Sequence, residues 1–110
     1  MIRPGSSISK TNNAVNTWFH FSIIFANPTI TLYINGAKDA TSTDPNWLMG
    51  DHPLGLGQQT QSLMGKRNWD GILDEVRIAT VARSADWIKL DFESQKAGSK
   101  LVTFGPVQMK

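Results

Sequence analysis

The sequence predicts an all-β protein, an antiparallel sandwich of two sheets (a jelly roll) with one short helix. Several short segments rich in aromatic and β-branched residues alternate apolar with polar positions, as strands with one buried face do. An Asn35-Gly36 pair separates two of these segments, and both residues tolerate the positive φ of a tight hairpin turn. Helical spacing follows only Ser84, so we expect about six strands and one helix.

The first two predicted strands comprise residues 18–25 and 29–34, separated by the turn-forming Asn27-Pro28. The first strand places on one face Phe19, Phe21, Ile23 and Phe25, and on the other Trp18, His20, Ser22 and Ile24. The second has an apolar face of Ile30, Leu32 and Ile34, with Tyr33 on the opposite face beside Thr29 and Thr31. Residues 37–41 are then the return strand of the hairpin.

Three further strands are predicted at residues 53–57, 71–78 and 101–104, with polar loops between the earlier ones. Ser84 has the character of a helix N-cap, and Asp86 lies in the first turn, where the helix dipole favours a carboxylate. Gly98 suits the C-terminal stop of this helix. Trp87 is expected to dock the helix onto the sandwich.

Composition excludes several classes of protein. A chain of 110 residues has room for one domain, so residues 1–110 are taken as a single sandwich. There is no cysteine, which excludes disulfides, thiolate metal sites and cysteine nucleophiles. A net charge of +2 is too small to indicate a nucleic-acid-binding surface. No apolar run reaches the roughly 20 residues of a membrane span, and the N-terminus has no signal-peptide core, so the chain stays where it is made or lacks its export signal.

Ordered motifs connect these elements to a known family. They are Trp18-x-His20, Leu32-Tyr33-x-Asn35-Gly36, the Pro-Leu-x-Leu-Gly of residues 53–57, the Asp-Gly-x-x-Asp-Glu-Val-Arg-Ile of residues 70–78, and Ala82-Arg83-Ser84. Over roughly residues 16–104 the chain resembles the C-terminal part of a laminin-G-like, concanavalin A-like jelly-roll module. The resemblance implies an appendage of large secreted bacterial proteins, often beside polysaccharide-degrading domains. Many such modules bind glycans or proteins, some bind calcium, and the superfamily also contains glucanases.

The chain departs from the family at its start. A full module has several strands ahead of the Trp-x-His strand, whereas here only residues 1–17 precede Trp18. Part of the sandwich is therefore expected to be missing. An incomplete sheet leaves an open edge or an uncovered apolar face, and both attract partners. We expect the chain to complete its core as a homo-oligomer.

Three acidic residues are candidates for chemistry: Asp70, Asp74 and Glu75. Asp74 shares its predicted strand face with Ile72 and Val76, so it should be buried and needs a partner. The first expectation is that it binds loop amides or an arginine such as Arg83. One alternative is a calcium site with Asp74 and Asp70 as ligands, and calcium is the only cofactor that the sequence suggests. The other alternative is a catalytic carboxylate pair among these three residues.

The catalytic alternative lacks the usual spacing. Acidic residues at alternate positions of one strand would share a face, but the residues two away from Asp74 and Glu75 are apolar or arginine. A glycoside hydrolase would need its second carboxylate from another loop, such as Asp44 or Asp51.

Aromatic and amide side chains are candidates for sugar binding, which uses flat rings against C–H patches and polar groups for the hydroxyls. The candidate ligand-binding residues are Trp47, Trp69, Tyr33, His20, Asn46, Gln58 and Asn68. Trp47 is either a plug over the sandwich end or an exposed platform, and Trp69 is favoured as a plug. Trp18 is expected to be structural, and His20 to be packed or hydrogen-bonded within the sheet.

The function predicted first is a noncatalytic carbohydrate-binding module of a larger secreted bacterial polysaccharide-active protein, located outside the cell or on its surface. Its partners would be a glycan or polysaccharide and further copies of the chain. A small glycoside hydrolase of the same fold and a structural protein-interaction module are the alternatives. The preference for the first rests on family analogy.

Overall fold

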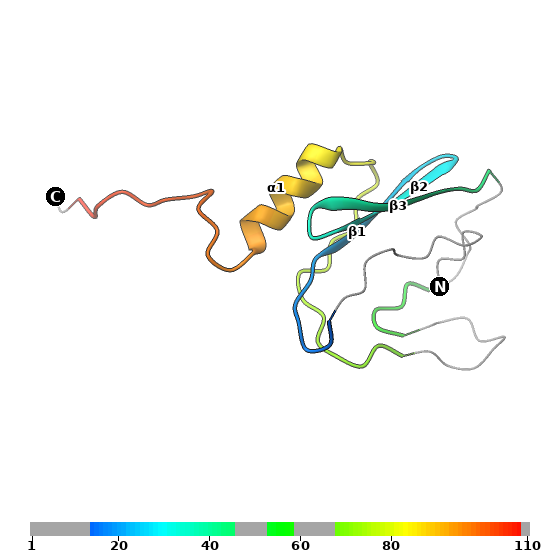
Figure 1. Cartoon of the computed structure of the whole chain (residues 1–110), viewed down its shortest axis with the longest axis horizontal. Helices are drawn as coiled ribbons and strands as arrows, with labels where there is room; N and C mark the ends of the chain where they lie inside the picture. Colours follow the sequence, from blue (N-terminus) through cyan, green and yellow to red (C-terminus); the bar gives the residue numbers. More distant parts are fainter. Residues whose placement is uncertain (1–13, 46–52, 59–67, 109–110) are drawn as a thin grey trace.

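The computed structural model describes residues 14–45, 53–58 and 68–108. In chain order the elements are β1 (Phe21–Ala26), β2 (Thr29–Ile34), β3 (Ala37–Thr43) and α1 (Ala85–Gln95) (Figure 1). The three strands form one antiparallel sheet in the order β1-β2-β3. The mostly-β architecture with one short helix agrees with the predicted fold class. The one described helix is too short and too polar to cross a bilayer.

Antiparallel pairing confirms the predicted faces of the first two strands. Phe21 lies opposite Ile34, Ile23 opposite Leu32, and Phe25 opposite Ile30. Residues opposite each other in an antiparallel pair point to the same face, so these six side chains share one apolar face. Ile30 and Ile34 are buried there, together with Ala40 of β3 and Ile88 of α1. Phe21 and Ile23, at the β1 side, remain exposed.

The hairpin between β2 and β3 forms where the Asn-Gly pair predicts it. Asn35 and Gly36 have φ values of 49° and 76°. Asn35 also connects the hairpin to His20, the residue before β1. The Asn35 backbone amide donates to the His20 carbonyl at 2.7 Å, and the Asn35 side-chain Oδ1 accepts from the His20 backbone amide at 2.9 Å. This exchange extends the β1–β2 pairing to His20 and fixes the direction in which the His20 side chain points.

Helix α1 begins as the sequence predicts. The Ser84 hydroxyl accepts a hydrogen bond from the Trp87 amide at 3.2 Å, the usual N-cap contact. The helix ends at Gln95 with Lys96 as C-cap, ahead of the predicted stop at Gly98. Ile88, only 2% exposed, is the buried residue of the helix. Trp87 remains more than one-third exposed beneath the Arg83 guanidinium, so Ile88 and not Trp87 docks the helix.

Three predicted strands are absent from the described structure. Residues 53–57, 71–78 and 101–104 form no strand, and the only pairing in or beside them is a bridge between Gln58 and Asn68. Left-handed residues interrupt two of these segments, Gly57 at φ 67° and Glu75 at φ 52°. Residues 97–108 extend away from the helix (Figure 1). Strand character alone is not sufficient, because a strand also needs a hydrogen-bonded neighbour.

Candidate functional site

Three of the predicted sugar-binding residues meet in one short ribbon. Gln58 and Asn68 form an antiparallel bridge, and the Trp69 amide donates to the Gly57 carbonyl at 2.7 Å. Residues 57–58 and 68–69 are called the Trp69 ribbon below. Two segments that are separate in sequence are thereby held side by side. This juxtaposition is long-range, and no local pattern in the sequence indicated it.

The ribbon presents different chemistry on its two faces. Gln58 and Asn68 lie opposite each other, so their amide side chains share one face. Trp69 is the next residue along, and its side chain turns to the other face. The indole packs edge-on against Phe19, with ring centroids 6.2 Å apart and an interplanar angle of 63°. Trp69 is nevertheless 48% exposed. One part of its side chain therefore packs against Phe19, and another part is accessible to a ligand.

Close packing holds the ribbon in place. A Cβ placed on Gly57 would lie 3.3 Å from the Leu73 Cδ1 and 3.6 Å from the Trp69 Cβ. Gly57 also has a positive φ, which favours glycine. Leu73 and Trp69 therefore both pack close against this backbone, and residue 57 has little space for a side chain.

The remaining candidate ligand residues are not part of the ribbon. His20 points to α1, whereas its neighbour Phe19 contacts Trp69. Tyr33 is partly buried on the more polar face of the sheet, opposite Ser22 and Lys38. The predictions for Asn46 and Trp47, like those for Asp51, lie outside the described residues. Trp18, expected to be structural, is 67% exposed.

A polar cluster around Asp91 was not anticipated. The Asp91 Oδ2 lies 3.2 Å from the His20 Nε2, and its Oδ1 accepts from the Arg77 Nη1 at 2.5 Å and from the Gln95 Nε2 at 3.1 Å. The Asp91 side chain is only 11% exposed. These four residues are called the Asp91 cluster. The cluster connects His20, the residue before β1, with the 71–78 segment and with α1. It therefore holds three separate parts of the fold together. His20 was expected to be packed or hydrogen-bonded within the sheet; its backbone bonds to Asn35 of the hairpin, but its imidazole bonds to Asp91 of α1.

A signal for this cluster exists in the sequence. Asp91 follows the buried Ile88 by three residues, and Gln95 follows it by seven, so both lie on the inward side of α1. An acidic residue within the inward stripe of a helix needs a partner, because an unpaired buried carboxylate is costly.

The acidic residues proposed for chemistry have simpler roles. Asp74 is exposed, so its predicted burial is wrong. The left-handed backbone of Glu75 interrupts the alternation that would have turned Asp74 inward. The Asp74 Oδ1 accepts a hydrogen bond from the Glu75 backbone amide at 2.8 Å, so its partner is a loop amide, one of the two partners expected. Arg83, the other expected partner, lies over the Trp87 ring, 5.1 Å from its centre. Glu75 Oε2 lies 3.0 Å from the Arg77 Nη2, and Asp70 is exposed.

A calcium ion needs six to eight oxygen ligands. Within the described ranges, no group of three or more His, Asp or Glu side chains converges on a point where a metal ion would sit. Asp70 and Asp74 therefore do not by themselves supply the ligands of such an ion.

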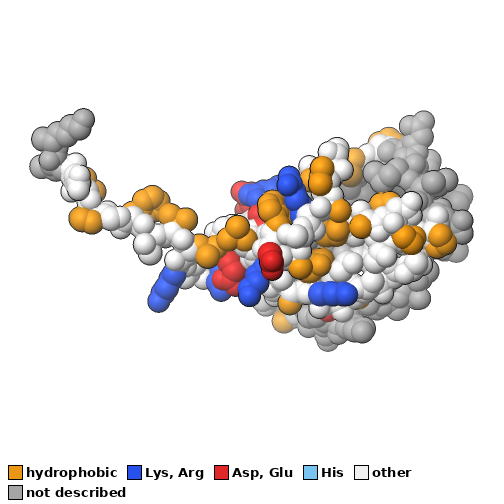
Figure 2. Space-filling model, turned by 90° about the horizontal axis from the view of Figure 1, so that it is seen from above, with side chains coloured by type: hydrophobic (Ala, Val, Ile, Leu, Met, Phe, Trp, Pro, Cys, Tyr) orange, Lys and Arg blue, Asp and Glu red, His pale blue; other side chains and the backbone are white. Residues whose placement is uncertain are grey.

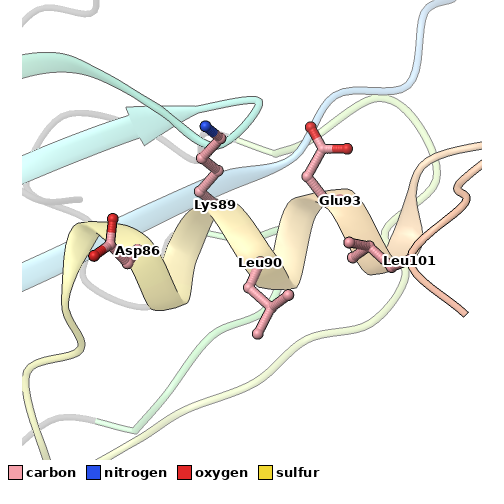
Figure 3. Close-up of a pocket in the computed structure, with 5 residues that line it drawn as sticks. All are labelled: Asp86, Lys89, Leu90, Glu93 and Leu101. Atoms are coloured by element: carbon pink, nitrogen blue, oxygen red, sulfur yellow. The ribbon is translucent and has the colours of Figure 1, made fainter.

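One shallow hollow lies beside α1, with a volume of about 280 Å³. It is lined by Asp86, Lys89, Leu90, Glu93 and Leu101 (Figure 3). Leu90 and Leu101 supply its apolar part, and the three charged side chains have mixed sign. It contains no aromatic ring on which a sugar could stack, so the Trp69 ribbon is the better candidate site.

Comparison with known proteins places the chain in a family. Curated protein sequences gave no match. The chain is similar to a crystallised part, residues 221–444, of an S-layer domain-containing protein from Clostridium thermocellum ATCC 27405. The TM-score is 0.62 at 27% identity, and the match covers 76% of this chain but 43% of the solved one, so this chain spans less than half of that structure. Residues 4–89, most of the chain, match the model of the concanavalin A-like lectin/glucanase superfamily, and the chain therefore belongs to that superfamily.

Proposed function

We propose that the chain is a noncatalytic carbohydrate-binding module of a larger, secreted or cell-surface bacterial protein. The observation that carries this proposal is the half-exposed Trp69 indole, fixed on a ribbon that also presents the Gln58 and Asn68 amides. Membership of a superfamily of lectins and glucanases supports a glycan as the partner. The S-layer domain in the name of the similar solved protein supports a place at the cell surface.

The chemistry of the ribbon suits a sugar. The exposed part of the indole offers an apolar surface for the C–H patch of a pyranose ring, and the edge-on contact with Phe19 holds the indole in place. The two amides supply both donors and acceptors for hydroxyl groups. Because the indole and the amides lie on opposite faces, we assign the main binding surface to Trp69 and a secondary one to the amide pair.

Replacing Trp69 with alanine should weaken glycan retention about tenfold or more, since stacking on an aromatic ring contributes on the order of 1–3 kcal/mol where it has been measured for other planar ligands. Affinity electrophoresis through gels containing xylan, mixed-linkage β-glucan or mannan measures this effect. Trp18→Ala is the matched control, because Trp18 is also exposed but is not part of the ribbon. Equal retention of the wild type and Trp69→Ala would remove Trp69 from the site.

The hydrolase alternative gains no support from the described carboxylates. Glu75 is paired with Arg77, Asp74 with the Glu75 amide, and Asp91 with three side chains. Glu75 and Asp91 both bond to the Arg77 guanidinium, which bridges these two carboxylates.

A second candidate function, a protein-interaction module, is favoured by the amount of exposed apolar surface. Exposed apolar side chains occur in the 71–81 segment and in the C-terminal tail, and they include Ile72, Val76, Ile78, Val81, Val102 and Phe104. Those of the protruding tail are visible in orange in Figure 2. Large amounts of exposed apolar surface are typical of interaction sites on folded proteins. We propose a further copy of the chain as the partner.

Self-association should therefore depend on concentration, and the double variant Ile72→Thr/Ile78→Thr should reduce it, because threonine keeps the branch at Cβ while replacing the ethyl arm of isoleucine with a hydroxyl. Light scattering coupled to size-exclusion chromatography measures the mass. Val107→Thr, at an exposed position of the tail, is the control. A wild-type chain that is monomeric at all working concentrations would contradict this proposal.

A further inference from the structure

The segment from Trp69 to Arg77 is attached at its two ends. At the first end, the Trp69 amide bonds to Gly57, and Leu73 packs close to the same glycine. At the other end, Arg77 bonds to Asp91 of α1. Between these attachments the segment forms no strand, and its apolar side chains are exposed. Residues 69–77 are called the strap. Its order depends on a few specific side-chain contacts, because no sheet ladder supports it.

Arg77 makes the contacts of the second attachment. Its guanidinium bridges two carboxylates, Asp91 at 2.5 Å through Nη1 and Glu75 at 3.0 Å through Nη2. Asp91 is a fixed acceptor, because it is largely buried and is held from other sides by His20 and Gln95. Glu75 is brought back toward Arg77 by its left-handed backbone, and its amide is capped by Asp74. The planar guanidinium makes both contacts in one fixed geometry, which the rotating donors of an ammonium group do not impose.

We infer that Arg77 is a positioning residue for the Trp69 ribbon: by anchoring the far end of the strap to Asp91, it keeps the near end, and with it the Trp69 indole, in one orientation. This inference rests on the proposed function for its effect on glycans. Without Arg77 the strap is free from its C-terminal end back to Leu73. Binding then has to order the segment, which should weaken glycan affinity about 3- to 10-fold.

The test compares Arg77→Met with Arg83→Met. Both remove one arginine, but Arg83 contacts only the Trp87 ring among the described residues. With 5-fluorotryptophan incorporated, Arg77→Met should shift or broaden the fluorine resonance of Trp69, and Arg83→Met that of Trp87. Amide hydrogen exchange should show lost protection at the hydrogen-bonded Trp69 and Glu75 amides of Arg77→Met, with protection in β2 and β3 unchanged. Unchanged Trp69 resonance and strap protection in Arg77→Met would overturn the inference.

A merely structural role predicts a different pattern. It would reduce protection throughout the sheet and would leave affinity unchanged at temperatures well below unfolding. Arg77→Lys keeps a charged donor for Asp91, so it should restore the Trp69 resonance and bring affinity to within about twofold of the wild type. Cellohexaose, xylohexaose and mannohexaose are the glycan probes. If the wild type binds none of them, the proposed function fails, while the fluorine and exchange measurements still decide whether Arg77 positions Trp69.

Discussion

Replacing Asp91 with alanine is expected to lower the free energy of unfolding by about 3 kcal/mol, the range seen when one partner of a buried ion pair is removed. The change deletes the acceptor shared by His20, Arg77 and Gln95. The His20 side chain is 17% exposed, and its Nδ1 is buried without a hydrogen-bond partner in the described part of the chain. In these residues Asp91 is therefore the one hydrogen-bond partner of the imidazole. The imidazole would be left buried and unsatisfied, which is the main source of the cost.

Equilibrium unfolding in urea, followed by far-ultraviolet circular dichroism, measures this loss. Asp86→Ala is the matched control, because Asp86 is an exposed aspartate in the first turn of the same helix. Its removal should cost at most about 1 kcal/mol through the helix dipole. If Asp91→Ala were no more destabilising than Asp86→Ala, the Asp91 cluster would not be the anchor between β1, the strap and α1.

Replacing Gly36 with alanine should destabilise the protein by about 2–5 kcal/mol, for two separate reasons. A non-glycine residue in the left-handed region costs roughly 1–2 kcal/mol. In addition, the new Cβ would lie 2.9 Å from the Phe92 Cδ1 and 3.3 Å from the Lys89 Cα, so the hairpin would have to move away from α1. Displacement of well-packed groups typically adds a further 1–3 kcal/mol.

Gly98 separates these two contributions. Its φ of 73° is close to the 76° of Gly36, but a Cβ there would meet no atom within 4 Å. Gly98→Ala should therefore show the cost of the backbone conformation alone, and the difference between the variants measures the contact between hairpin and helix. Equal changes in unfolding free energy for the two variants would contradict the close approach of Gly36 to Phe92.

The features that the sequence predicted correctly are those with local causes. The Asn35-Gly36 turn needs only two residues that accept positive φ, and the helix start needs only Ser84 in front of a helical pattern. The alternating faces of β1 and β2 follow from the pleat and from burial on one side. Each of these signals lies within a few residues, so a single sequence contains it in full.

The predictions that failed depend on partners distant in the chain. Residues 71–78 have strand composition, but no described neighbour pairs with them, and the left-handed Glu75 breaks their alternation. The predicted burial of Asp74 was wrong for the same reason. At the candidate site, Gln58, Asn68 and Trp69 were each identified by residue type, but their meeting in one ribbon is a tertiary fact. The Asp91 cluster likewise joins residues 20, 77 and 91, which no local pattern connects.

The most direct test of the central claim is mass-resolved size-exclusion chromatography of the wild-type chain with soluble xylan, mixed-linkage β-glucan and mannan, with reducing ends assayed in the same fractions. A noncatalytic carbohydrate-binding module should elute with at least one of these polysaccharides and release no new reducing ends. Trp69→Ala should lose that co-elution, and Trp18→Ala should keep it. Elution of the wild type apart from every polysaccharide, or the appearance of reducing ends in its fractions, would contradict the claim.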